Sequence, residues 1–258
     1  MPAFEEARRL GVGGIELDVR ITADGIPVVI HDATVDRTTN ARGRVARFTY
    51  AELRTLDAGR RGEEPGHGVR VPCLAEVLDW AATTGLVINT ELKPAGSSSA
   101  RIQLLRAMRK VIRENGRADH LVVSSFDPVL MAAIADEHLG VETAIVVRRP
   151  MRNAPAYAQR LGVHGIHPAR LVAPRRLIVA ARASGLAVRP WTVNDARHIA
   201  AFATAGCEAI VTDYPKRALA ALQPQPFGDE LRQVRSAEEE LVERDRPRPG
   251  RQGAAADE

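Results

Sequence analysis

Carboxylates at alternate positions of two short apolar segments are the residues best placed to do chemistry in this chain. Glu16 and Asp18 lie in GIELDV, and Glu91 lies in INTELK with Lys93 two positions later. If both segments are strands, side-chain alternation puts each pair on one face. Three carboxylates that converge repel one another unless a cation or a proton compensates, and their oxygens suit Mg²⁺ or Ca²⁺. We therefore predict that Glu16, Asp18 and Glu91 hold a divalent cation.

Other side chains could act on a substrate beside that cation. Lys93 would place a positive charge next to a bound phosphate, and His31 could transfer a proton near neutral pH. Trp191 is either a core residue or an apolar wall for an alcohol, and His167 could line the rim of the site. Asp213 could cap a helix or face the rim. Each acid, taken alone, could also be a solvated or ion-paired surface group.

Short β-branched segments alternate with amphipathic helical segments along residues 1–222. Repeated βα units of this length favour a TIM (β/α)₈-type barrel, an α/β fold whose active site lies at the carboxyl ends of the strands. The strands are expected at 14–22, 26–32, 86–93, 120–126, 142–147, 164–168, 186–193 and 208–213. Helices are expected at 1–10, 74–84, 99–114, 128–139, 153–161, 174–184, 195–205 and 215–222.

The first two strands break the βα alternation because only Ala23-Asp24-Gly25 separates them, which predicts a β-hairpin. With Asp24-Gly25 as a two-residue turn, His31 lies opposite Asp18; a three-residue turn would shift this register by one residue. Without the returning arm, seven parallel strands remain where a barrel needs eight. Because the chain opens directly on a helix, we expect that the first strand is missing.

Composition excludes several classes of protein. The chain has 258 residues, a net charge of +4 and two cysteines, and its tail at 223–258 is charged and expected to be mostly disordered. No apolar run is long enough to cross a membrane, and two cysteines cannot make a disulfide framework. No nucleic-acid-binding pattern accompanies the arginines. We therefore expect a cytoplasmic protein that acts on a small molecule, with no nucleic-acid partner and no stable membrane insertion; its oligomeric state is left open.

A series of motifs in a fixed order runs through the whole of residues 1–222. They are PAFEEARRLGVGGIELDVRITADGIPVVIHD, DRTTNARGRV, LRTLDAG, VPCLAEVLDW, INTELKP, VVSSFDP, GIHPARLV, RPWTVND and AIVTDYP. In these motifs the chain resembles the glycerophosphodiester phosphodiesterase family, most closely its compact bacterial cytoplasmic branch. The resemblance implies a TIM barrel with a small, mobile cap insertion after the hairpin histidine, at about 36–72. It also implies metal-dependent hydrolysis of glycerophosphodiesters to an alcohol and glycerol 3-phosphate.

The same resemblance assigns roles to single residues. Glu16, Asp18 and Glu91 match the metal ligands, and His31 matches one of two catalytic histidines. Lys93 matches a phosphate-contacting lysine, and Trp191 lies at the substrate side. His167, in GIHPARLV, is added as a candidate substrate-binding residue. The family's His-Arg-Gly strand, with the other histidine, has no counterpart here, so a catalytically impaired phosphodiester-binding remnant is one alternative, and a lysophospholipase D-like activity is another.

Overall fold

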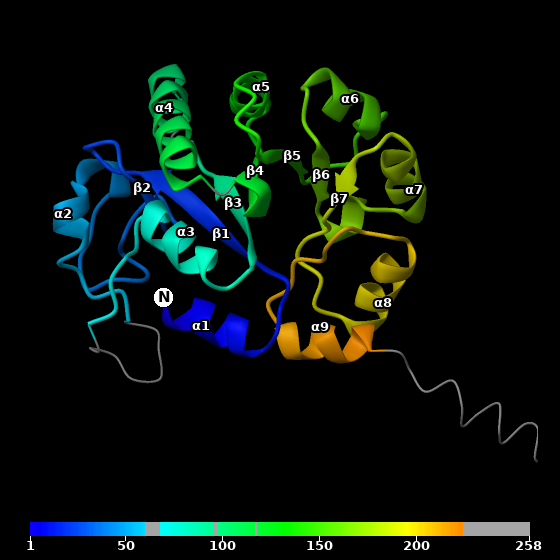
Figure 1. Ribbon diagram of the computed structural model, residues 1–258, viewed down its shortest axis with the longest axis horizontal. Helices are drawn as coiled ribbons and strands as arrows, with labels where there is room; N and C mark the ends of the chain where they lie inside the picture. Colours follow the sequence, from blue (N-terminus) through cyan, green and yellow to red (C-terminus); the bar gives the residue numbers. More distant parts are fainter. Residues whose placement is uncertain (60–67, 95–96, 117, 224–258) are drawn as a thin grey trace, which may run out of the picture. The chain divides into compact units, whose positions relative to one another are not determined.

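The computed structural model describes residues 1–59, 68–94, 97–116 and 118–223 (Figure 1). Its compact unit spans Met1–Leu222. Among the described residues, one seven-stranded sheet has the order β2-β1-β3-β4-β5-β6-β7, and every neighbouring pair is parallel except β1 with β2. The strands are β1 (Gly14–Ile21), β2 (Pro27–Val29), β3 (Val87–Leu92), β4 (Leu121–Ser125), β5 (Glu142–Val147), β6 (Gly165–Pro168) and β7 (Ala187–Val188). This is the predicted α/β architecture of a parallel, TIM-type barrel sheet.

Helices follow the strands and lie outside the sheet (Figure 1). The sequence marks their ends: Ser97 accepts a hydrogen bond from the Ala100 backbone at the start of α4, and Gly116 ends that helix at φ +67°. The α-helices are α1 (Pro2–Arg9), α2 (Tyr50–Leu53), α3 (Leu74–Ala82), α4 (Ser98–Asn115), α5 (Pro128–Asp136), α6 (Ala154–Arg160), α7 (Arg175–Ala183), α8 (Ala196–Thr204) and α9 (Pro215–Leu222). Short 3₁₀ turns are η1 (Val45–Arg47), η2 (Ala118–His120) and η3 (Arg170–Val172). None of the described helices has the length and apolar character that crossing a bilayer requires.

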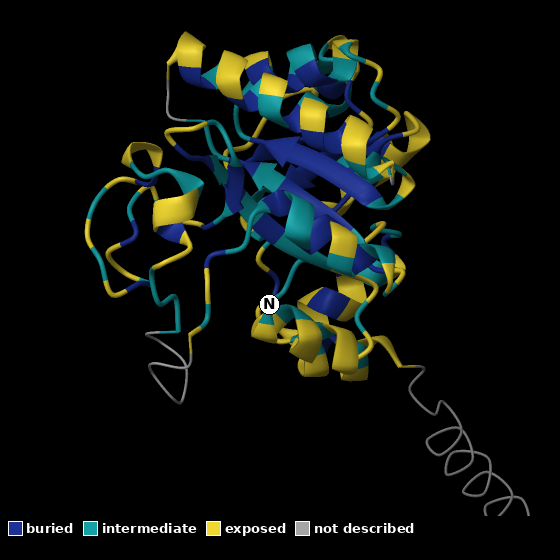
Figure 2. Ribbon diagram, turned by 60° about the vertical axis from the view of Figure 1, so that its left-hand side comes forward, coloured by how far each residue is buried: buried dark blue, intermediate teal, exposed yellow. Residues whose placement is uncertain are grey.

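The main core lies between the sheet and these helices, where Figure 2 shows buried strands under helices with exposed outer faces. Leu17 and Val19 of β1 are at most 4% exposed and belong to the same buried cluster as Leu74 of α3 and Leu104 of α4. Because side chains alternate along a strand, burying this apolar face turns the neighbouring polar positions of β1 to the other side of the sheet.

The predicted register of the hairpin is wrong by one residue. Val19 pairs with Val29, and the Ile30 backbone N–H donates to the Asp18 carbonyl, so His31 lies one residue beyond the position opposite Asp18. The cause is a three-residue loop: Gly25 adopts φ +80° and donates to the Thr22 carbonyl, as in a type I turn followed by a left-handed glycine. His31 therefore leaves the hairpin at the rim of the barrel.

The predicted strands at 186–193 and 208–213 are less regular than expected. The former is reduced to β7, because Pro190 has no N–H to donate to a strand ladder. The segment 208–213 is not a strand, although it runs beside β7: the Glu208 N–H donates to the Val188 carbonyl and the Val211 N–H donates to the Pro190 carbonyl. Among the described residues, Gly14–Leu17 of β1 have a strand partner on one edge only, which is β3.

The region predicted as the cap, 36–72, contains α2 and η1, and its residues 60–67 lie outside the described residues. Its apolar side chains do not join the main core. They form a second buried cluster against β2 and the residue after it: Val28, Ile30, Val35, Val45, Leu53 and Val71. The cap therefore has a small core of its own at one side of the barrel. The predicted tail lies outside the described residues from residue 224 onward.

Candidate active site

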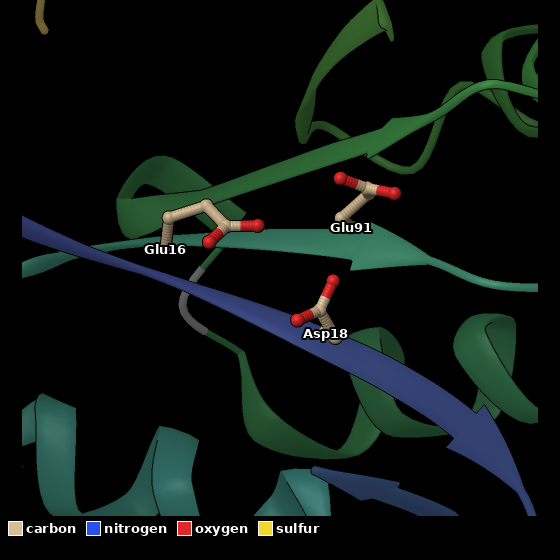
Figure 3. A group of neighbouring side chains, drawn as sticks. All are labelled: Glu16, Asp18 and Glu91. Carbon is tan, nitrogen blue, oxygen red and sulfur yellow. The ribbon is translucent and has the colours of Figure 1, made fainter. Parts of the chain in front are cut away.

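Three carboxylates meet on the polar side of β1 and β3 (Figure 3). The two strands are parallel, and their register places Asp18 directly beside Glu91 and Glu16 beside Asn89. One oxygen from each of Glu16, Asp18 and Glu91 lies within 4.8 Å of the others. The structure therefore brings together the three side chains that strand alternation had put on one face.

Burial and repulsion between neighbouring carboxylates raise the pKa values of Glu16 and Glu91. Burial, the Asp18 carboxylate and the Glu91 carboxylate raise the pKa of Glu16 to about 8. Burial also raises the pKa of Glu91, although the neighbouring Lys93 ammonium opposes that shift. The arrangement holds more negative charge than the protein compensates, and a cation would relieve it.

Lys93 supplies part of the compensation. Its Nζ lies 2.5 Å from Glu91 Oε1 and 3.0 Å from Asp18 Oδ1. Burial lowers the pKa of Lys93, but the interactions with Glu91 and Asp18 outweigh it, so the net pKa lies above the ordinary value. Three carboxylates and one ammonium leave two negative charges when all four groups are ionised. The oxygen donors, their spacing and this residual charge all fit a hard divalent cation.

A cavity of about 320 Å³ opens over the carboxylates, at the carboxyl ends of the strands. It is lined by Glu16, Asp18, His31, Asn89, Glu91, Lys93, Ser124, Phe126, Val146, Arg148, His167, Trp191, Thr192, Val211 and Asp213. All seven site residues predicted from the sequence are in this set, and so is Asp213. Phe126, Arg148, Asn89 and Ser124 were not foreseen, although Ser124 and Phe126 lie in the VVSSFDP motif and Asn89 lies in INTELKP.

His31 stands at the rim of this cavity and is oriented by an acid that the motifs did not single out. Its Nδ1 lies 2.7 Å from Asp32 Oδ1, and Arg20 Nε donates to its backbone carbonyl. Asp32 also accepts from Arg37 through Nε to Oδ2 at 2.5 Å and Nη2 to Oδ1 at 3.0 Å. The hydrogen bonds from Arg37 and His31 hold the pKa of Asp32 far below its usual range. Because Asp32 directly follows His31 in the sequence, its role in orienting the His31 ring could have been predicted.

The remaining predicted residues form the far wall. His167 is 2% exposed, and burial together with the Arg189 charge lowers its pKa to about 3, so its ring is neutral. Its Nε2 has no hydrogen-bond partner among the described residues. Trp191 Nε1 donates to the His167 carbonyl, and its ring meets Phe126 edge-on with centroids 5.6 Å apart. Trp191 is thus half-buried in the cavity wall instead of the core.

Comparisons with known proteins agree on one family. Residues 1–217 match the model described as the glycerophosphoryl diester phosphodiesterase family. Among curated relatives, a glycerophosphodiester phosphodiesterase of Caldanaerobacter subterraneus subsp. tengcongensis is 32% identical over 83% of this chain and 87% of its own. Another, from Bacillus altitudinis, is 33% identical over 85% and 90%.

Solved structures show the same likeness in three dimensions. A putative glycerophosphoryl diester phosphodiesterase from Silicibacter pomeroyi superposes with a TM-score of 0.78 at 29% identity, over 86% of this chain and 87% of that one. A phosphodiesterase from Oleispira antarctica, solved in complex with the product sn-glycerol-3-phosphate, gives a TM-score of 0.78 at 25% identity, over 86% and 90%. Together with the family match, these likenesses identify the fold as a TIM barrel.

Proposed function

We propose that this chain, which belongs to the glycerophosphoryl diester phosphodiesterase family, depends on a divalent cation, Mg²⁺ or Ca²⁺, to hydrolyse glycerophosphodiesters to an alcohol and glycerol 3-phosphate. The observation that carries the proposal is the convergence of Glu16, Asp18 and Glu91, with oxygens within 4.8 Å and two uncompensated charges when ionised. The Oleispira antarctica relative was solved with sn-glycerol-3-phosphate, and the same product follows from cleaving the proposed substrates.

Four charged residues of the cavity bind the cation and the phosphate in the proposed reaction. Glu16, Asp18 and Glu91 would hold the cation, which when bound supplies Lewis-acid stabilisation of charge on the phosphate. Lys93 neutralises part of the carboxylate charge and presents its third N–H to a phosphate oxygen. The phosphodiester is thereby oriented over the carboxylates with its charge balanced.

Proton transfer is assigned to His31. Because Nδ1 faces Asp32, Nε2 is the ring nitrogen left for the cavity. It either takes a proton from the attacking hydroxyl or returns one to the leaving alcohol, and Asp32 holds the tautomer that this requires. The attacking hydroxyl belongs to water, which gives glycerol 3-phosphate directly, or to the glycerol moiety. In the second case the alcohol leaves from a cyclic phosphate, which water then opens to glycerol 3-phosphate.

The test is the release of glycerol 3-phosphate from glycerophosphoglycerol, monitored by an enzyme-coupled assay. The assay contains about 2 mM Mg²⁺ or Ca²⁺, which exceeds the dissociation constants of about 10⁻⁴–10⁻³ M found at weak calcium sites. We expect EDTA to abolish turnover and either cation to restore it. His31→Ala should lower kcat by about 10²–10⁴, the usual worth of a general acid or base, and Glu16→Ala should abolish the response to cation. His198→Ala on α8 and Glu114→Gln on α4 are matched controls, since both side chains are exposed outside the cavity.

Activity that survives EDTA, or that is unchanged in both site variants, would contradict the proposal. Cation-dependent binding of glycerol 3-phosphate without any turnover would instead favour the phosphodiester-binding alternative. Release of phosphatidic-acid-type products from acylated substrates only would favour the lysophospholipase D-like one.

A further inference from the structure

One arginine at the mouth of the cavity has no part in the proposed reaction. Arg148 directly follows β5, is exposed and lines the cavity. Its guanidinium carbon lies 5.0 Å from the centroid of Phe126 and 5.7 Å from that of Trp191. These distances are those of cation–π contacts, so the two rings hold the guanidinium in place at the cavity wall.

The rings would otherwise suit another ligand. Phe126 and Trp191 stand at 85° to each other, and such perpendicular aromatic pairs are what proteins use to bind quaternary ammonium groups. Here Arg148 lies over both rings, and Lys93 Nζ is 5.9 Å from the Phe126 centroid. A trimethylammonium group would therefore have to displace a guanidinium and approach two positive charges.

The charged residues near Arg148 are also positive. Arg149 and Arg152 are exposed on the same loop, and Arg170 lies in η3, just after β6. None of these four arginines forms an ion pair with an acid in the part of the chain that the structure describes. The β5–β6 side of the rim therefore carries an excess of positive charge, opposite the carboxylates on β1 and β3.

We propose that Arg148, seated on Phe126 and Trp191, makes the site select glycerophosphodiesters with polyol head groups over those with a quaternary ammonium head group. The guanidinium offers N–H donors to head-group hydroxyls and occupies the aromatic faces that choline would need. This inference rests on the proposed function, because it treats the cavity as the place where the diester binds.

The test compares glycerophosphoglycerol with glycerophosphocholine in wild type, Arg148→Gln and Arg149→Gln. Wild type should have the higher kcat/KM for glycerophosphoglycerol. Arg148→Gln should shift the ratio of the two kcat/KM values toward glycerophosphocholine by about tenfold, the worth of a freed cation–π site, mainly through KM. Arg149→Gln, which removes an equal charge next in the chain but not from the rings, should leave the ratio nearly unchanged.

A second measurement does not need turnover. Titration calorimetry with choline chloride should give no binding to wild type and measurable binding to Arg148→Gln. Hydrolysis of neither diester by wild type would count against the proposed function, and the choline titration would still decide the role of Arg148. The inference would be overturned if the ratio of the two kcat/KM values did not change in Arg148→Gln, or if Arg149→Gln shifted it equally. It would also be overturned if Arg148→Gln lost activity uniformly on both diesters, or if wild type and Arg148→Gln bound choline equally.

Discussion

Cation binding at Glu16, Asp18 and Glu91 is expected to release close to one proton at neutral pH. Burial and the two neighbouring carboxylates raise the pKa of Glu16 to about 8 when no cation is bound. At pH 7 a group with this pKa is about 0.9 protonated, and near pH 9 it is about 0.1 protonated. A carboxylate must be ionised to bind a metal, so cation binding at pH 7 must release about 0.9 protons per protein molecule from Glu16.

Titration calorimetry measures this number directly. Mg²⁺ or Ca²⁺ is titrated at pH 7 in two buffers of different ionisation enthalpy, and the difference in apparent enthalpy gives the protons released. We expect about 0.9 protons to be released at pH 7 from Glu16, and a marked fall in that number by pH 9. Glu16→Gln is the matched variant and should lose most of the release at pH 7. Cation binding without proton release, or release that Glu16→Gln leaves intact, would refute the reasoning.

The raised pKa of Glu16 also makes the free energy of unfolding depend on pH. The dependence has the opposite sign to that of an acid whose pKa is lowered by an ion pair. Between the unfolded pKa near 4.5 and the folded pKa of about 8, the folded chain holds a proton on Glu16 that the unfolded chain has lost. Rising pH through this interval therefore lowers the free energy of unfolding. In denaturant titrations of the cation-free protein, Glu16→Gln should flatten that decline relative to wild type. Saturating the wild type with cation should flatten it too, because the bound cation keeps Glu16 ionised.

Three further predictions concern the scaffold. Gly14→Ala should lower the free energy of unfolding by about 1–3 kcal/mol in urea titrations, because its Cβ would lie 2.7 Å from the Val87 carbonyl oxygen, whereas Gly13→Ala meets no atom within 4 Å and should change it little; equal effects would contradict this. The pKa of His167 is lowered to about 3, so between pH 7 and 5 the unfolded chain binds a proton at this residue and the folded chain does not. This difference should lower the free energy of unfolding by about 2 kcal/mol over that interval, and His167→Gln should abolish this part of the pH dependence. Burial raises the pKa of the Cys207 thiol to about 11, so its alkylation by iodoacetamide, followed by mass spectrometry, should accelerate about tenfold per pH unit from pH 7 to 10; a plateau near pH 9 would disprove it.

Most element positions could be predicted because local chemistry marks them. Asp127 accepts from the Val129 and Leu130 N–H groups at the start of α5, and Gly116 ends α4 in the left-handed conformation. Alternation along β1 and β3 was likewise enough to place Glu16, Asp18 and Glu91 on one face. These features depend on neighbours a few residues away, and such information is present in a single sequence.

Features set by contacts across the fold could not be predicted. Asp24-Gly25 is compatible with two turns, and the hydrogen bond from the Ile26 N–H to Thr22 Oγ1 helps to select the longer one. The irregular path of 208–213 depends on Pro190 in the segment beside it. The seat of Arg148 on Phe126 and Trp191 needs three loops to meet, which no spacing in the sequence reveals.

Asp32 is shared between the barrel and the cap region. One of its oxygens faces His31, and Arg37 from the cap binds both. The cap has its own small core around Val45 and Leu53, so it can open with less free energy than the barrel needs to unfold. Unfolding of the cap would separate Asp32 from the Arg37 guanidinium and leave the His31 ring less firmly oriented. The carboxylates on β1 and β3 would keep their positions, because the barrel stays folded. Turnover would then be lost at a lower temperature than cation binding. The stability of the cap, and not that of the barrel, would set the enzyme's temperature optimum.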